Sequence, residues 1–506
     1  MNGKQDALFR FAAAPKGVET VREPLSFMRR GADAHGAYPD SLAISQNWSV
    51  AAQGSDVPVY AVPVTRCGPH SFCRVELLAE GCAAALRLKF SGMLHEVRIT
   101  PQTDALQWRK EGGDIICKLA APCTFTVEVN GRMYTPLTVF VEAPEQNIPR
   151  REDPNVLWFG PGLHRVSSLE LHTGQTLYLA SGAVLKAVQP GKEEAPTVAG
   201  DWAGVPNYKD FIRAQDSEDI KVLGRGIVDL SELEWHARRT LCFTRCRRVT
   251  VDGPVLLGAA HWTAAFFGCE DVTVKNLVIF GYRENSDGID LVNCTRAQVS
   301  RCYIRTGDDA VCIKAMEPPP AVGGRDILVE HCTVWNDKVR ALGIAGESRG
   351  EIYNIIFRRC TVLHSLADWA AEVGALCVVL CDAGTVHDIV FEQIDVLDER
   401  ANGINCMLFR DRWSTDTQAG HIRAICFRDI SLPKNVSVRL WGYDAAHRVE
   451  DILLQNVHGK CPLYGLPLGC NNTDFVTALG NIDTNDKHHR SHSVCRDGRF
   501  AGRAAS

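Results

Sequence analysis

The sequence lacks the features that mark membrane, secreted and nucleic-acid-binding proteins. Its most apolar run, residues 373–380, is far shorter than the roughly 20 residues of a membrane-spanning helix. Residues 1–23 carry scattered charges and no uninterrupted apolar stretch, so we expect no secretory signal and a cytoplasmic location. The formal net charge of −5 comes without a basic stripe. We therefore expect no nucleic-acid or membrane partner, and the sequence does not indicate an oligomeric state.

The sequence also lacks a CxxC pair, although it contains 20 cysteines. In a long chain without an expected secretory signal, reduced thiols are a better interpretation than a disulfide framework. Many of the cysteines recur at equivalent places in a repeat, as Cys332, Cys360 and Cys426 do. A small buried hydrophobe suits such positions, so we expect core packing and neither a metal nor a cofactor.

Helical periodicity is missing from residues 57–143, which instead show short alternating runs. The runs are VPVYAVPV, FCRVELL, ALRLKF, HEVRIT, DIICKL, CTFTVEVNG and TPLTVFVEA. Turn sequences such as CGPH, EGG and NGR separate these runs, a pattern typical of an antiparallel sandwich. The first fifty or so residues look irregular. We therefore predict an N-terminal β-sandwich domain with an irregular leader over residues 1–150, ending in a connector rich in proline and charge.

From about residue 220 the same short phrase returns, as in DIKVLGRGIV, DVTVKNLVIF and DILVEHCTVW. The first strand residues of successive repeats lie 23 to 36 residues apart: Ile220, Val249, Val272, Ala297, Ile327, Ile355, Ile389, Ile425 and Ile452. Coils of two or three strands have this length, and stacking them buries one continuous core. The phrases lack the LxxLxL pattern of leucine-rich repeats and are shorter than propeller blades. The prediction is an all-β protein whose right-handed parallel β-helix spans residues 151–480.

The remaining residues, 481–506, form a polar tail that contains His488, His489 and His492. A metal site is one interpretation of these three histidines. Solvated side chains in a charged tail are the more common case, and we prefer that interpretation.

Three aspartates in the repeat region carry the functional prediction. Asp287 lies in the phrase NSDGIDL (285–291), and Asp308 and Asp309 lie in TGDDAVCIK (306–314). A separation of 21 to 22 residues is close to one coil, so the carboxylates should stack on adjacent rungs. Carboxylates brought together raise one another's pKa, so one stays protonated near neutral pH. A protonated and an ionised carboxyl supply the acid and the base for glycoside hydrolysis.

Two other interpretations of these aspartates stay open. Asp-Gly and Gly-Asp-Asp occur in ordinary turns at coil corners, and stacked acids also bind calcium. Asp290 illustrates the first, since strand alternation places it on a different face from Ile289, where its role could be structural. The same alternation puts Asp308 and Asp309 on opposite faces unless the chain bends, and Gly307 makes such a turn or bulge plausible.

The segments 259–272, 285–291 and 306–314 resemble the polygalacturonase family, glycoside hydrolase family 28, among the pectin-lyase-like β-helix hydrolases. They also resemble the dextranase and isopullulanase family, glycoside hydrolase family 49, which carries a β-sandwich before its β-helix. The stretch TVWNDKVRALGIAGE (333–347) is closer to the second family. These resemblances imply an inverting hydrolase in which Asp308 is the general acid and Asp287 and Asp309 activate water.

One departure from the polygalacturonase pattern bears on the substrate. The family's Gly-His-Gly phrase corresponds here to Ala341-Leu342-Gly343, with no histidine, and its Arg-Ile-Lys phrase has only a partial echo in VRLWGY (438–443). We therefore expect a neutral, α-glucan-like oligosaccharide or polysaccharide. The alternatives are a polygalacturonase-like hydrolase of a uronide-containing glycan and a non-catalytic carbohydrate-binding β-helix. A polysaccharide lyase or epimerase is a further alternative in the same fold.

Neighbouring coils supply candidates for substrate binding, because aromatic rings stack on sugars and charged groups bind hydroxyls or carboxylates. These candidates are His261, Trp262, Glu284, Lys314, Trp335, Lys338 and Arg340. Trp413 and Trp441 are weaker candidates for a cleft wall. Inserted stretches at 315–324 and 401–420 could close one end of a groove, which would favour release of sugars from one chain end.

Overall fold

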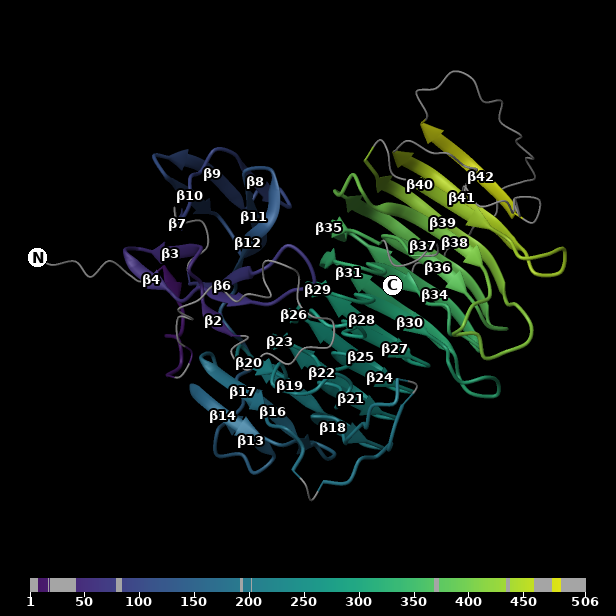
Figure 1. Cartoon of the computed structure of the whole chain (residues 1–506), viewed down its shortest axis with the longest axis horizontal. Helices are drawn as coiled ribbons and strands as arrows, with labels where there is room; N and C mark the ends of the chain where they lie inside the picture. Colours follow the sequence, from purple (N-terminus) through teal and green to yellow (C-terminus); the bar gives the residue numbers. More distant parts are fainter. Residues whose placement is uncertain are drawn as a thin grey trace, which may run out of the picture.

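The computed structural model describes residues 8–16, 18, 42–78, 84–191, 194–201, 203–367, 373–433, 437–458 and 476–483. Every regular element in these residues is a β-strand (Figure 1). Within the same residues, no helix has the length and apolar character that crossing a bilayer demands. The all-β prediction is confirmed.

Twelve strands form the N-terminal domain, as two sheets. The strands are β1 (Phe9–Arg10), β2 (Ala43–Ile44), β3 (Trp48–Ala52), β4 (Ser55–Val57), β5 (Tyr60–Val62), β6 (His70–Leu77), β7 (Ala84–Phe90), β8 (Val97–Thr100), β9 (Leu106–Glu111), β10 (Asp114–Leu119), β11 (Cys123–Val129) and β12 (Arg132–Glu142). One sheet has the order β2-β5-β6-β12-β11-β8, with β1 beside β6, and the other has β4-β3-β7-β10-β9. Buried residues such as Leu86, Phe125 and Val139 fill the space between them.

The sandwich differs from its prediction in two respects. The leader is not wholly irregular, because it contributes β1, β2 and most of β3 to the sheets. The sheets are also not wholly antiparallel, since β12 pairs with β6 in parallel, with Leu137 opposite Ser71. Alternating side chains report which residues face a core, but not the direction in which a partner strand runs.

The remaining strands form the β-helix. They are β13 (Val156–Phe159), β14 (Gly162–Val166), β15 (Leu169–Glu170), β16 (Thr176–Leu179), β17 (Ala183–Ala187), β18 (Ile212–Gln215), β19 (Lys221–Gly224), β20 (Ile227–Asp229), β21 (Leu241–Thr244), β22 (Arg247–Asp252), β23 (Val255–Leu257), β24 (Ala264–Phe267), β25 (Glu270–Lys275), β26 (Val278–Phe280), β27 (Ile289–Val292), β28 (Thr295–Ser300), β29 (Tyr303–Thr306), β30 (Val311–Lys314), β31 (Gly324–Glu330), β32 (Thr333–Asn336), β33 (Leu342–Ile344), β34 (Glu351–Arg358), β35 (Thr361–Ser365), β36 (Leu376–Leu380), β37 (Thr385–Val396), β38 (Asn402–Leu408), β39 (His421–Ser431), β40 (Ser437–Trp441), β41 (Val449–His458) and β42 (Val476–Asp483).

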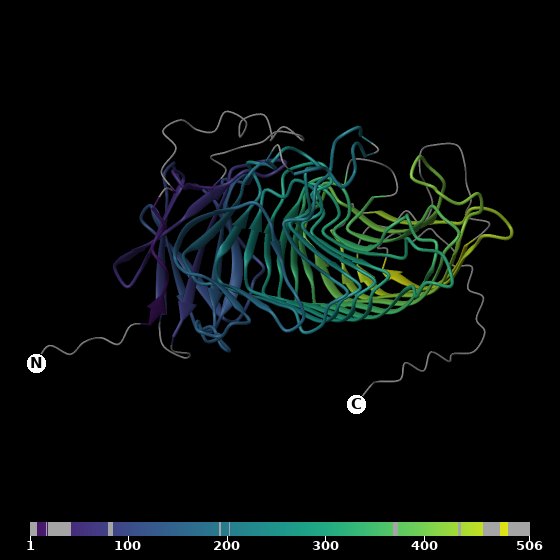
Figure 2. The ribbon, with the colours of Figure 1, turned by 90° about the horizontal axis from the view of Figure 1, so that it is seen from below.

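Up to the last coil, the strands of the β-helix pair in parallel with their equivalents one coil later (Figure 2). A typical coil contributes one strand to each of three columns, as β28, β29 and β30 do, followed by β31, β32 and β33. The column β15-β18-β21-β24-β27-β30-β33-β36-β38-β40 is a separate ten-stranded sheet. Parallel crossovers of this kind are almost always right-handed. The predicted right-handed parallel β-helix is confirmed.

The predicted repeat positions stack in register. Val249 pairs with Val272, Val272 with Ala297 and Ala297 with Ile327, and the series continues to Ile452. These side chains belong to one continuous buried core, which also contains Cys332 and Cys360. Cys426 is only half-buried and lies outside that core, so its predicted packing is wrong. The cysteines that the structure describes are free thiols.

The coils turn at residues in the left-handed backbone region. The residue just before each stacked position has a positive φ, as in Asp271 (57°), Arg296 (55°) and Asp326 (56°). These corner residues also bind one another from coil to coil, since Arg296 Nε lies 2.7 Å from Asp271 Oδ1. A non-glycine residue in this conformation is uncommon and costs energy, which such side-chain ladders help to offset.

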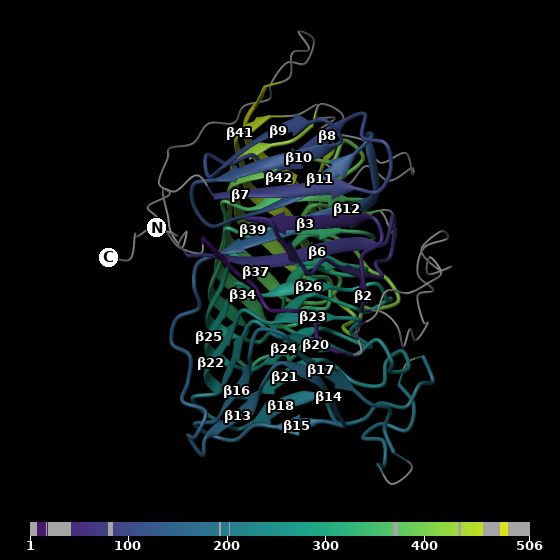
Figure 3. The same cartoon turned by 90° about the vertical axis from the view of Figure 1, so that its left-hand side faces the viewer.

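The sandwich packs against one flank of the β-helix (Figures 1 and 3). Phe72 and Phe140 from the sandwich share a buried cluster with Phe280, Tyr303 and Trp335 from β26, β29 and β32. Between the two parts, β12 ends at Glu142 and β13 begins at Val156. At the other end, β42 reaches Asp483, inside the segment predicted as a polar tail. The tail histidines lie outside the described residues.

Candidate active site

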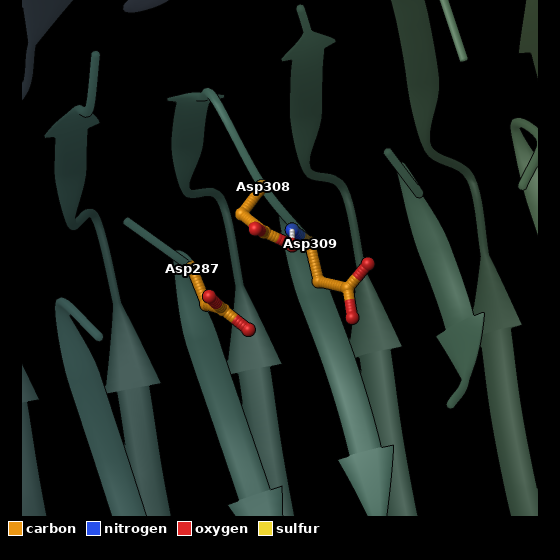
Figure 4. A group of neighbouring side chains, drawn as sticks. All are labelled: Asp287, Asp308 and Asp309. Atoms are coloured by element: carbon orange, nitrogen blue, oxygen red, sulfur yellow. Dashed lines mark hydrogen bonds between the residues drawn. The ribbon is translucent and has the colours of Figure 1, made fainter. Parts of the chain in front are cut away.

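Asp287, Asp308 and Asp309 converge at the start of two neighbouring strands (Figure 4). Asp287 lies just before β27 and the Asp308–Asp309 pair just before β30, and these strands pair with Ile289 opposite Val311. The backbone N–H of Gly288 donates to the carbonyl of Asp309 at 2.8 Å, which continues the ladder back to the aspartates. One carboxylate oxygen from each residue lies within 4.8 Å of the others. The one-coil spacing therefore does bring the trio together.

A turn lets the adjacent Asp308 and Asp309 share this site. Strand β29 ends at Thr306 and β30 begins at Val311, so strand alternation does not apply between them. Asp308 Oδ1 accepts a hydrogen bond from the backbone N–H of Asp309 at 2.9 Å, and the Thr306 hydroxyl donates to the Asp308 carbonyl at 2.7 Å. A Cβ on Gly307 would lie 2.4 Å from Thr65 Oγ1, so the turn is built for glycine. The bend anticipated at Gly307 is present.

Two cations balance the acidic charge. Arg340 Nη1 lies 2.9 and 2.7 Å from the two carboxylate oxygens of Asp309. Lys314 Nζ lies 3.7 Å from an oxygen of Asp287 and 3.7 Å from one of Asp290. Lys314, Asp287, Asp290 and Asp309 are almost completely buried. Removing one member of such a buried charge group is costly, because it leaves the other charges uncompensated.

Burial and mutual repulsion raise the pKa of the acids. Burial, followed by the neighbouring Asp309 carboxylate, raises the pKa of Asp308 to about 6. Burial, followed by Asp308, raises the pKa of Asp287 well above its usual value. Asp290 is buried on the outer face of β27 and has its pKa raised to about 7, with Lys314 acting in the opposite direction. The site thus holds protons at pH values where exposed aspartates are ionised.

Trp262 and His261 lie one coil before Asp287. The Trp262 ring is half-buried, with Lys314 Nζ 4.2 Å and the Arg239 guanidinium carbon 5.6 Å from its ring centroid. His261 Nδ1 accepts the backbone N–H of Trp262 at 2.8 Å, and burial lowers its pKa well below the usual value. Both residues are therefore near the trio.

Glu284 and Lys338 form an ion pair at 2.8 Å, with partly exposed side chains. Each is close in sequence to a site residue, Glu284 next to Asn285 and Lys338 two residues before Arg340. The pair links the loop before Asp287 to the coil that follows Asp309. Both remain candidates for contacts with substrate.

The structure corrects the prediction made for Trp335. It is 0% exposed and belongs to the cluster between the sandwich and the β-helix, with the Arg305 guanidinium carbon 3.9 Å from its ring centroid. The predicted sugar contact is therefore wrong for this residue. Trp441 packs with Phe409 on Cys377 further along the sheet, and Trp413 contacts Arg412 in the loop after β38.

Sequence reasoning missed several residues that hold the trio in place. Asn336 Nδ2 donates to the Asp308 carbonyl at 2.5 Å and to the Arg340 carbonyl at 2.8 Å. The backbone N–H of Asn285 donates to Asp308 Oδ2 at 3.1 Å, and Asn285 Oδ1 lies 3.0 Å from His236 Nε2. His236 Nδ1 in turn contacts Asp201. Asn285 and Asn336 stand in phrases already singled out, whereas nothing in the sequence links Asp201 to the site.

The trio's oxygens are close enough together to suggest a cation site. Calcium takes six to eight oxygen ligands. Here Arg340 occupies both oxygens of Asp309, and Lys314 faces Asp287. Two resident cations and carboxyls that retain protons suit a divalent ion poorly, so the geometry does not favour the calcium interpretation.

The comparisons with known proteins agree with one another on the family that this chain resembles. Residues 232–436 match the family described as Glycosyl hydrolases family 28. The chain is 29% identical over 186 residues to a polygalacturonase of Chamaecyparis obtusa, covering 33% of this chain and 35% of that protein. It is 23% identical over 179 residues to a polygalacturonase of Persea americana, covering 32% and 37%. The matches thus span about a third of the length of these curated relatives.

Among solved structures, a hyperthermoactive exopolygalacturonase from Thermotoga maritima superimposes with a TM-score of 0.53 at 19% identity. The match covers 64% of this chain and 82% of that one, and it supports the fold. The resemblance to the polygalacturonase family and to pectin-lyase-like β-helices is therefore confirmed. The likeness to the dextranase and isopullulanase family stays a prediction.

Proposed function

We propose that this protein is a glycoside hydrolase of the family 28 type, which cleaves O-glycosidic bonds in a galacturonate-containing glycan. The observation that carries the proposal is the meeting of three carboxylates within 4.8 Å on adjacent rungs, in the region that matches the family. Acid and base groups close to one bond are what glycoside hydrolysis requires.

In the proposed mechanism, Asp308 donates a proton to the glycosidic oxygen as the bond breaks. Its pKa of about 6 keeps it protonated in mildly acidic solution. Asp309, whose charge is balanced by Arg340, orients the attacking water and accepts its proton, together with Asp287. Because Asp287 also has a raised pKa, the trio shares its protons, and the pH profile reports the group rather than one residue.

We also propose that the reaction inverts the anomeric centre, as the family resemblance implies. Inverting enzymes usually hold acid and base carboxyls roughly 6.5–9.5 Å apart, whereas retaining enzymes hold them about 5–5.5 Å apart. The nearest trio oxygens are within 4.8 Å, which is shorter than the usual inverting spacing. Proton NMR of the first product anomer distinguishes the two outcomes directly.

The substrate assignment changes from the neutral glycan expected above. The family match and the relatives named polygalacturonase favour a uronide over an α-glucan. Paired assays on galacturonate oligomers and neutral oligoglucans separate the two.

The test of the function is hydrolysis of such oligomers by the purified protein and by Asp287→Asn, Asp308→Asn and Asp309→Asn. General acid–base groups contribute roughly 10²–10⁴-fold, so each variant should lose at least about 100-fold in kcat. Asp326→Asn is the matched control, since Asp326 is a coil-corner residue bonded to Asn354 at 2.6 Å.

The alternative functions predict different results. Unsaturated products would indicate a lyase. A wild type that binds the glycan without turnover, and aspartate variants that bind it equally well, would indicate a binding protein. Either result overturns the proposal. The product sizes from a long chain test the predicted release from one end, and fractionation of cells tests the predicted cytoplasmic location.

A further inference from the structure

Arg305 is a fully buried cation between the sandwich and the β-helix, three residues before Asp308. Its guanidinium pairs with Asp337 at 3.0 Å and lies 2.7 Å from His70 Nδ1. It also donates to the carbonyl of Arg66 at 2.5 Å. His70 and Arg66 belong to the N-terminal domain. The domain thus supplies two of the acceptors that satisfy this buried charge.

The protonation state of His70 follows from its partners. The Arg305 N–H group donates, so His70 Nδ1 accepts, and Nε2 carries the ring proton toward Thr138 Oγ1 at 2.7 Å. Burial, followed by the charge of Arg305, lowers the pKa of His70 well below its usual value, which agrees with a neutral ring. The ring also packs against Phe280, Tyr303 and Trp335 of the β-helix.

From Arg305 the contacts lead directly to the catalytic turn. The Arg305 partner Asp337 donates its backbone N–H to the carbonyl of Thr306 at 2.9 Å. The neighbouring side chains of Thr306 and Asn336 both donate to the carbonyl of Asp308, at 2.7 and 2.5 Å. Arg305 and Thr306 at the end of β29, with Asn336 at the end of β32 and Asp337 just after it, therefore connect the buried ion pair to the Asp308 backbone.

A second contact from the sandwich reaches the same turn. The Thr65 hydroxyl donates to the carbonyl of Tyr282 at 3.0 Å, and its oxygen is the atom nearest to a Cβ placed on Gly307. Tyr282 precedes the loop that carries Asn285, whose N–H binds Asp308. The segment 65–70 thus contacts the turn directly.

We propose that the N-terminal domain positions the catalytic turn, with His70 acting through Arg305 to hold Asp308 in place. His70 is a positioning residue, since it touches neither the trio nor the space beside it. The inference rests on the proposed function for its kinetic part only. Its structural part, the ordering of the turn by the sandwich, stands on the contacts alone.

The test compares three variants of the full-length protein. His70→Leu removes the acceptor for Arg305, His70→Gln retains both an acceptor and a donor, and Glu128→Gln alters another buried contact of the same interface. Glu128 Oε1 binds His364 Nε2 at 2.9 Å, on β35, one coil beyond the β32 residues that contact the turn. Glu128→Gln therefore controls for loss of interdomain stability.

We expect His70→Leu to lower kcat by about 10- to 100-fold while KM stays within about threefold, because a displaced acid slows the chemistry without removing substrate contacts. His70→Gln should recover most of kcat. Glu128→Gln should lower Tm but leave kcat within about twofold at a temperature where all variants are folded. Equal kcat in His70→Leu and Glu128→Gln overturns the proposal, as does a rise in KM alone.

Hydrogen–deuterium exchange provides a measurement that does not require turnover. The peptide covering residues 303–310 should exchange faster in His70→Leu than in the wild type or in Glu128→Gln. Equal exchange in the two variants overturns the inference even if the protein is a hydrolase. Faster exchange confined to His70→Leu supports it even if no hydrolysed substrate is found.

Discussion

The ammonium group of Lys314 lies 4.2 Å from the centroid of the Trp262 ring. On its other sides it faces Asp287 and Asp290, and Glu347 at 4.0 Å. A single buried cation thus touches an aromatic ring at the site and two of its protonatable acids. This arrangement makes Lys314 a determinant of the site's charge rather than a group free to bind substrate.

Lys314→Met should therefore narrow the pH optimum from its acidic side. Lys314 lowers the pKa of both Asp287 and Asp290, so its loss raises these values and the base needed for water activation is protonated at higher pH. The acidic limb of kcat/KM moves upward. The measurement is the pH profile between 4 and 8. Lys275→Met, in a partly exposed ion pair with Asp252, is the control, and an unmoved acidic limb in Lys314→Met contradicts the assignment.

Trp262→Ala and Trp335→Ala should have opposite signatures. Trp335 is fully buried, so its truncation should cost about 3–5 kcal/mol of stability with little change in KM. Trp262 is half-buried beside the trio, so its truncation should raise KM more than it lowers Tm. Denaturant unfolding and steady-state kinetics on both variants give the comparison. A KM change confined to Trp335→Ala would instead support the predicted sugar contact by Trp335.

The stability of Asp287→Asn relative to that of the wild type should rise with pH. Burial and Asp308 raise the pKa of Asp287 in the folded protein, so folding favours the protonated form. That stability is present below the unfolded pKa of about 3.9 and is lost as pH rises through the folded value. Asparagine removes this loss. Thermal unfolding of both proteins at pH 5 and pH 8 checks this prediction. A Tm of Asp287→Asn that falls relative to the wild type between pH 5 and pH 8 contradicts it.

His236→Leu should raise the pH at which activity is lost on the basic side. His236 holds Asn285, whose backbone N–H lowers the pKa of Asp308. Loosening Asn285 raises that pKa above its present value of about 6, so the general acid keeps its proton to higher pH. The pH dependence of kcat/KM gives the shift. His387→Leu, on the outer surface beside Glu351, should leave the profile unchanged.

Much of the architecture can be predicted from the sequence because each coil buries side chains at the same positions. Ile327 and Ile355 occupy one column, so their spacing reports the length of a coil, and a shorter coil of 22 residues brings Asp287 to Asp309. The turn at Gly307 also follows from local chemistry. These features depend only on neighbours in adjacent coils, which the repeat itself reveals.

The remaining features depend on contacts that no repeat encodes. Trp335 stands one residue from Asn336, yet it faces the sandwich, and the packing of one domain on another decides that environment. Asp201 reaches His236 from a long insertion between β17 and β18. The parallel pairing of β6 with β12 likewise follows from the connection of the sheets and not from the alternation within either strand.

The stacking of Asp287 and Asp309 on hydrogen-bonded rungs also limits how this site can evolve. Neighbouring strands are held about 4.8 Å apart by the backbone, a spacing that no side-chain substitution alters. The distance between catalytic groups can therefore change only in whole rungs or by a different side-chain rotamer. Descendants of such a scaffold would acquire new substrates by exchanging loops and ring platforms along the coil, while the spacing of the reacting groups stayed the same.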